Sequence, residues 1–177
     1  MRKEFLFLLG ILLAGCASMN DALTPGSSVV KDEFDGTLIV RQPPVGASSS
    51  FSEHVHSLGF EWFSREPNKV YLDTGAHFGA RTGGMIGLSF NVDGEIFSAE
   101  QANPFTRRDR QTYKESARFA VTFDQFRRIA SANVVKMRID GLGVSTVSSF
   151  GRGTGSGAMV TPKLAPFVEQ VLQIKSR

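Results

Sequence analysis

The sequence predicts an α+β fold, with an antiparallel β-sheet of about seven or eight strands and two late helices packed on it. Three observations support this class. Segments in which apolar and polar residues alternate dominate the chain after residue 29. Most links between these segments are too short for the crossover helices that parallel strands require. Helical spacing of apolar residues occurs only late in the chain. A β-sandwich with peripheral helices is the alternative architecture.

The expected strands follow one another with short turns. Alternation is clearest in residues 70–78, which is typical of a half-buried strand. The Asp93-Gly94 pair is the strongest hairpin signal in the sequence. Pro43 and Pro44 are expected to end the first strand. We expect strands at residues 37–41, 58–65, 70–78, 86–92, 95–98, 117–123, 135–140 and 144–150.

Two helices are expected. The first begins at a capping box formed by Thr122 and Gln125. The second begins with Thr161 as its N-cap and Pro162 in the first helical position. An apolar stripe predicts that this second helix lies across a sheet face and that the side chains of the stripe are buried. The stripe consists of Leu164, Phe167, Val168, Val171 and Leu172.

Residues 1–15 have the features of a secretory signal peptide. Arg2 and Lys3 supply a positive start, and residues 5–14 form an uninterrupted apolar run. This run is far shorter than the roughly twenty residues that a membrane-spanning helix needs. A basic start, a short apolar run and small residues at its end are typical of a segment that is removed after export.

The end of this segment, Leu13-Ala14-Gly15-Cys16, resembles the lipobox of bacterial lipoproteins. The resemblance implies cleavage before Cys16 and attachment of lipid to its sulfur and to the new amino group. Ala17 resembles the outer-membrane sorting signal of Gram-negative lipoproteins. The resemblance therefore implies a lipid anchor in the bacterial cell envelope, expected in the outer membrane and facing the periplasm.

The chain is expected to comprise a signal peptide (1–15), a lipidated flexible tether (16–28) and a single β-rich globular domain (29–177). Cys16 is the one cysteine, so no disulfide can stabilise the domain. The net charge of +3 is too small to predict nucleic-acid binding. No cofactor is expected, and the expected partners are the membrane, an acidic envelope component or another envelope protein.

Asp73-Thr74-Gly75-Ala76, after an apolar strand, resembles the active-site loop of retropepsin-like aspartic proteases. In that family one Asp from each of two copies shares a proton, which makes Asp73 the candidate catalytic residue. The family's later glycine segment leads into a helix, whereas residues 138–141 lead into another strand. Alternation also continues through the motif, which predicts a strand with Asp73 on its polar face.

His54 and His56 flank one residue and would share one face of a strand, which suits two metal ligands. His77 is a possible third ligand, although nothing in the sequence fixes its position relative to the other two. A His-x-His pair before a strand also occurs without a metal. Asp73 and His77 lie about 13 Å apart along a strand, too far to hydrogen-bond directly.

Residues 101–114 are polar and basic and are expected to form a loop or arm. Such an arm could contact an anionic partner, because several unpaired cations cannot all be buried. The alternative is a solvated loop without a partner. The candidate contact residues are Arg107, Arg108, Arg110, Lys114 and Arg118.

Residues 150–158 are rich in glycine. The Gly-Lys-Ser/Thr end that a phosphate-binding loop requires does not occur there. We therefore expect a hairpin or connecting loop.

Three functions remain open from the sequence. The first is a membrane-anchored, non-enzymatic binding or envelope-maintenance module. The second is a small-ligand carrier with an apolar cavity between sheet and helices. The third is an aspartic-type hydrolase that uses Asp73. The geometry of the pockets would distinguish the three.

Overall fold

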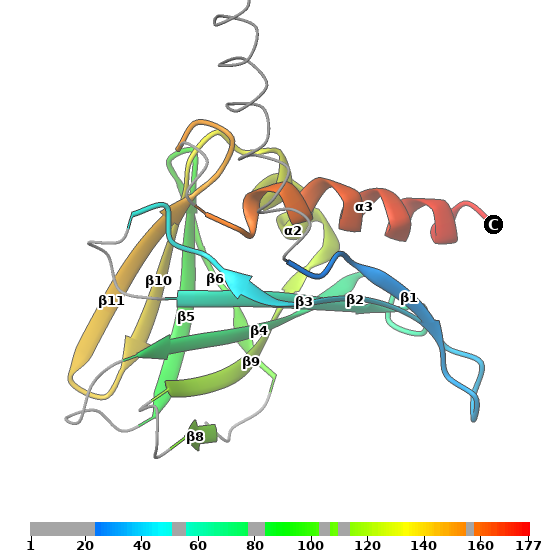
Figure 1. Ribbon diagram of the computed structural model, residues 1–177, viewed down its shortest axis with the longest axis horizontal. Coiled ribbons are helices and arrows are strands. Elements are labelled where there is room, and N and C mark those ends of the chain that lie inside the picture. Colours follow the sequence, from blue (N-terminus) through cyan, green and yellow to red (C-terminus); the bar gives the residue numbers. More distant parts are fainter. Residues whose placement is uncertain (1–23, 51–55, 78–83, 103–106, 110–113, 155–157) are drawn as a thin grey trace, which may run out of the picture.

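The computed structural model describes residues 24–50, 56–77, 84–102, 107–109, 114–154 and 158–177. Within these ranges it contains eleven strands and two helices, and both helices come late in the chain. The predicted α+β class is therefore confirmed. The strands form two sheets instead of one, as in the alternative architecture, and the strands of the two sheets cross steeply in Figure 1.

The larger sheet has the order β1-β2-β3-β4-β9-β7, and β8 also pairs with β9. All of its pairs are antiparallel. Its strands are β1 (Ser28–Lys31), β2 (Leu38–Gly46), β3 (His56–Phe63), β4 (Lys69–His77), β7 (Glu100–Gln101), β8 (Arg107–Asp109) and β9 (Lys114–Thr122).

The smaller sheet has the order β11-β10-β5-β6. Its predicted hairpin is confirmed, because Asp93 and Gly94 turn the chain with positive φ angles of 49° and 101°. Only Ala99 separates β6 from β7, so the chain passes there directly from the smaller sheet to the larger one. The strands are β5 (Met85–Val92), β6 (Glu95–Ser98), β10 (Val135–Gly141) and β11 (Val144–Phe150).

The two helices are α2 (Phe123–Ser131) and α3 (Thr161–Lys175). The capping box of α2 is confirmed: the Gln125 N–H donates to Thr122 Oγ1 at 3.1 Å, and the Thr122 N–H donates to Gln125 Oε1 at 2.8 Å. The N-cap predicted for α3 is wrong, because Val160 occupies that position and provides no side-chain cap. The hydroxyl of Thr161 instead accepts a hydrogen bond from the Gly151 N–H at 3.3 Å.

The inner face of the larger sheet is covered in two parts. Helices α2 and α3 cover one part, where the Phe60 ring of β3 lies 5.0 Å from Phe126 and 4.7 Å from Phe167, between centroids (Figure 1). The smaller sheet covers the other part, where His56 of β3 bonds to Ser148 of β11. One continuous apolar core therefore joins both sheets and both helices.

The prolines do not end the first predicted strand, which was expected to stop at Pro43. Strand β2 continues to Gly46 across an irregularity between Gln42 and Val45. A bulge of this kind accommodates residues that cannot donate to the ladder. Gly59 makes the close approach possible, because a Cβ there would lie 2.7 Å from the Pro44 nitrogen.

Candidate functional site

Helix α2 is amphipathic, with an apolar face and a charged face on opposite sides. Phe123, Phe126 and Ile129 are buried against the sheet, and Ala130 lies at the edge of the buried face. The opposite face carries Asp124, Arg127 and Arg128. This pattern is what the 3.6-residue period of the sequence predicts for a helix on a protein surface.

Helix α3 buries only part of the stripe that the sequence defines. Leu164, Phe167 and Val171 are buried, Val168 is half-buried, and Leu172 is 41% exposed. The expectation that Leu172 lies in the core is therefore wrong. The stripe is wider than the contact that α3 makes with the core, and its far edge faces α2 across a gap.

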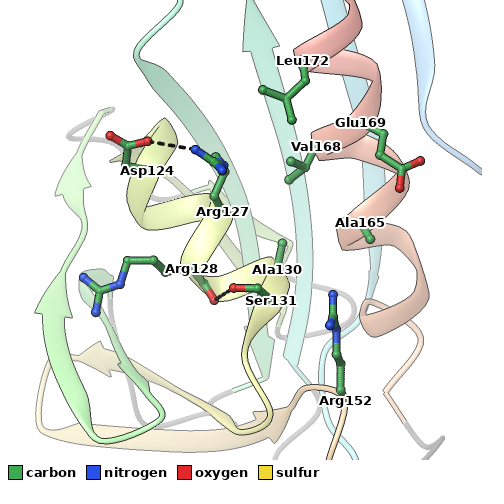
Figure 2. A pocket seen from close by; sticks show the side chains of 10 residues that line it. All are labelled: Asp124, Arg127, Arg128, Ala130, Ser131, Arg152, Ala165, Val168, Glu169 and Leu172. Carbon is green, nitrogen blue, oxygen red and sulfur yellow. Dashed lines mark hydrogen bonds and ion pairs between the residues drawn. The ribbon is translucent and has the colours of Figure 1, made fainter.

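This gap is an open groove of about 470 Å³ between the two helices (Figure 2). Its apolar surface comes from short or branched side chains of both helices. Charged side chains surround this surface, and three of them are arginines. The lining residues are Asp124, Arg127, Arg128, Ala130, Ser131, Arg152, Ala165, Val168, Glu169 and Leu172.

Arg152 reaches the groove from the glycine-rich segment after β11. The Arg152 N–H donates to the Ala132 carbonyl at 3.3 Å, and the Gly153 N–H donates to the Asn133 carbonyl at 2.8 Å. Gly151 allows this contact, because its φ is +128° and a Cβ there would lie 2.5 Å from the Asn133 carbonyl oxygen. The start of the predicted connecting loop is thus fixed against the end of α2, whereas residues 155–157 lie outside the described ranges.

The three arginines of the groove differ in their partners. Arg128 donates to Glu95 of β6 at 2.8 Å, and this hydrogen bond lowers the pKa of the Glu95 carboxyl. Arg127 has a longer ion pair of 3.7 Å with Asp124. Arg152 is exposed and makes no ion pair within the part of the chain that the structure describes. Arg152 and Arg127 are therefore the cations best placed to meet a ligand.

Asp73 lies on β4, on the outer face of the larger sheet, as the alternation predicts. Its two carboxylate oxygens accept hydrogen bonds of 2.8 Å each from Nε and Nη2 of Arg118 on β9. This bidentate bond to Asp73 is the main cause that raises the pKa of the Arg118 guanidinium. Asp73, the candidate catalytic residue, and Arg118, a candidate contact residue for an anionic partner, are therefore paired with each other.

Arg118 also holds a second carboxylate. Its Nη2 donates to Glu61 Oε2 at 2.7 Å, and Arg41 Nε lies 2.8 Å from Glu61 Oε1. The Glu61 side chain is only 9% exposed, so it depends on these two cations for charge compensation. Four charged side chains on β2, β3, β4 and β9 thus form one network across the sheet.

We expect Arg118→Gln to lower the free energy of unfolding by about 1–3 kcal/mol, because it leaves Asp73 unpaired and Glu61 with one cation. Arg41→Gln is the matched control. The Arg41 side chain is 57% exposed, and its loss should cost about 0–1 kcal/mol. Urea unfolding followed by circular dichroism measures both values. Equal losses in the two variants would contradict a special role for Arg118.

His56 is buried and links the two sheets. Its Nδ1 lies 2.7 Å from Ser148 Oγ, and its Nε2 lies 2.8 Å from Thr146 Oγ1, both on β11. Both ring nitrogens that could bind a metal therefore face hydroxyl groups. His54 lies outside the described residues, as does the side chain of His77. Among the described residues, no three His, Cys, Asp or Glu side chains gather closely enough to hold a metal ion.

The predicted basic arm is partly built into the larger sheet. Arg107 and Arg108 belong to β8, and Lys114 begins β9, so residues 101–114 are not one loop. Backbone pairing with β9 explains the difference, since Arg108 lies opposite Glu115. Arg110 lies outside the described residues, as do the side chains of Arg107, Arg108 and Lys114. Cys16 also lies outside them.

No family model matches the sequence, and no curated protein matches it either. The chemistry of the groove therefore has to follow from its own residues. No helix in the described ranges combines the length and the apolar character needed to cross a bilayer.

The sequence did not single out the groove. Helical spacing alone puts Arg127 and Arg128 opposite the apolar residues of α2, and Arg152 stands within the glycine-rich residues 150–158. The missing information was the distance between these segments, because residues 127 and 152 are separated by β10 and β11. The one local signal that could have indicated the groove is the position of Arg152 directly after Gly151, the glycine that packs against the end of α2.

Proposed function

We propose that this protein is a lipid-anchored lipoprotein of the bacterial envelope whose folded domain is a non-enzymatic binding module. The observation that carries the proposal is the Leu13-Ala14-Gly15-Cys16 sequence directly after an apolar run. Ala17 favours the outer membrane, with the domain facing the periplasm. The chain then reaches the first strand at Ser28, which leaves a short segment between anchor and fold.

The hydrogen bonds of the candidate catalytic and metal-binding side chains support a binding function over catalysis. Asp73, the best catalytic candidate, is held in a bidentate bond by Arg118. His56 is buried with both ring nitrogens bonded to hydroxyl groups. By contrast, the groove between α2 and α3 presents both apolar and cationic groups to solvent. An open surface of this kind suits the recognition of a partner.

The packing of the core also supports a surface site over an internal carrier cavity. The rings of Phe60, Phe126 and Phe167 contact one another with centroid distances of 4.7–5.2 Å. These side chains fill the space between β3 and the two helices, where the sequence suggested an apolar cavity. A ligand that reaches the helices is therefore expected on their outer side.

Cys16→Ser is expected to abolish lipid labelling of the protein in cells and to remove the mature chain from the membrane fraction. Each buried CH₂ contributes about 0.8 kcal/mol, so the loss of two or three acyl chains removes nearly all of the anchoring free energy. Metabolic labelling with a fatty-acid analogue, followed by fractionation, measures both effects.

Ala17→Asp is the matched control for this experiment. It should leave lipid labelling intact and move the protein to the inner membrane, because in the lipoproteins that this segment resembles an Asp directly after the lipidated cysteine favours retention there. A Cys16→Ser protein that is still processed and still fractionates with membranes as before would overturn the proposed function.

A further inference from the structure

The groove between α2 and α3 combines an apolar surface with exposed arginines. Arg152 makes no ion pair among the described residues, and Arg127 has only a long, exposed one of 3.7 Å with Asp124. Val168 and Leu172 point into the groove from α3, and Arg152 extends along it toward Ala165 (Figure 2). Glu169 turns toward the other side of α3 in the same view. The chemistry that matches a cationic end and an apolar surface is an anionic amphiphile, in which a phosphate adjoins hydrocarbon.

The chain enters the domain beside the same helix. The Pro25 carbonyl accepts a hydrogen bond of 2.9 Å from Gln42 Nε2. The Thr24 carbonyl lies 3.5 Å from Nζ of Lys163, in the first turn of α3. The point at which the preceding segment meets the fold is therefore fixed at the start of α3.

The length of that segment limits how far α3 can be from an anchor. Residues 16–23 span at most about 28 Å when fully extended. Helix α3 has 15 residues and is about 22 Å long. With lipid on Cys16, as the proposed function on which this inference rests requires, the groove stays within reach of the lipid headgroups.

We propose that the groove docks on the membrane that carries the anchor, with Arg127 and Arg152 on the phosphates of anionic phospholipids and with Val168 and Leu172 against the hydrocarbon next to them. Two cations near an anionic surface give only a weak contact for a free protein. A tether raises the effective concentration of the surface to the millimolar range, so a weak contact is sufficient.

The test couples the mature chain, residues 16–177, to vesicles through Cys16 and a maleimide-bearing lipid. This chain contains every residue that the structure describes, and Cys16 is its one thiol. Leu172→Trp reports on the groove, and Val147→Trp on the outer face of the smaller sheet is the control. These positions are similarly exposed, at 41% and 45%, whereas Trp62, the one native tryptophan, is 1% exposed and gives a constant background.

A nitroxide-labelled phospholipid in the vesicles quenches tryptophan that lies at the bilayer surface. We expect quenching of Leu172→Trp on phosphatidylcholine vesicles that contain phosphatidylglycerol, and much less on phosphatidylcholine alone. The quenching should decline as salt is raised. Adding Arg127→Ser and Arg152→Ser should reduce the ratio of docked to undocked protein about tenfold to thirtyfold. The charge-matched pair Lys136→Ser and Arg138→Ser, on the smaller sheet, should leave it unchanged.

Quenching of Leu172→Trp no stronger than that of Val147→Trp would overturn the inference, and it is the result expected if the groove binds a protein instead. Quenching that is independent of phosphatidylglycerol or of the arginine pair would overturn it as well. Chemical coupling replaces cellular lipidation in this experiment. The two experiments can therefore fail separately. The Cys16→Ser experiment tests the anchor of the proposed function, and the vesicle experiment tests whether the groove docks once the chain is held at a bilayer.

Discussion

Replacing Phe167 with alanine is expected to lower the free energy of unfolding by about 3–5 kcal/mol. The Phe167 side chain is fully buried, and its ring contacts the rings of Phe60 and Phe126 at centroid distances of 4.7 and 5.2 Å. Truncation removes these contacts and leaves a cavity between α3 and the larger sheet. A domain of this size is stable by about 5–15 kcal/mol, so the variant should unfold at a much lower urea concentration.

Leu172→Ala is the control in the same helix. Leu172 belongs to the apolar stripe that the sequence defines, yet it is 41% exposed. Its truncation should therefore cost less than about 1 kcal/mol, in the range of surface substitutions that also remove some packing. Equal destabilisation by the two substitutions would show that α3 packs through a different face from the one described.

The second large effect is expected for Gly151→Ala, which should lower the free energy of unfolding by about 2–5 kcal/mol. Two costs combine at this position. An alanine at a φ of +128° is strained by about 1–3 kcal/mol. Its Cβ would also lie 2.5 Å from the Asn133 carbonyl oxygen, which forces the loop away from the end of α2. Thermal and urea unfolding measure the sum of the two costs.

Gly94→Ala separates the two costs. Gly94 also has a positive φ, of 101°, but a Cβ there would meet nothing within 4 Å. Only the backbone term remains, and the loss should be about 1 kcal/mol. If Gly94→Ala were as damaging as Gly151→Ala, the contact between the loop and α2 would contribute little. Arg152, which that contact positions, would then have no fixed place beside the groove.

Features that depend on neighbouring residues could be predicted from the sequence. The capping box at Thr122 and the turn at Asp93-Gly94 have the predicted geometry. Alternation through Asp73 placed this residue on the outer face of a strand. In each case the deciding interactions lie within a few residues of one another, so the pattern carries the information itself.

Features that depend on distant contacts could not be predicted in this way. From the sequence, Arg118 was grouped with the arginines and the lysine that could contact an anionic partner, but its partners Asp73 and Glu61 come from other strands of the same sheet. The prolines after residue 42 were expected to end a strand, yet the absence of a side chain at Gly59 lets β2 continue past them. Both outcomes depend on which strand becomes the neighbour, and alternation does not encode this.

The sequence by itself determined the local elements of this protein: where most strands alternate, where α2 begins and where the hairpin turns. The signal peptide and lipidation site that the first sixteen residues suggest also rest on the sequence alone, and they stay a prediction. Only the tertiary structure decided that the strands divide into two sheets, that Leu172 faces a groove and that Arg152 stands beside α2. The physical reason is the range of the interactions. The hydrogen bonds of a helix cap or a tight turn and the period of the side chains involve residues close in the chain, whereas strand pairing and packing join segments that the chain keeps far apart.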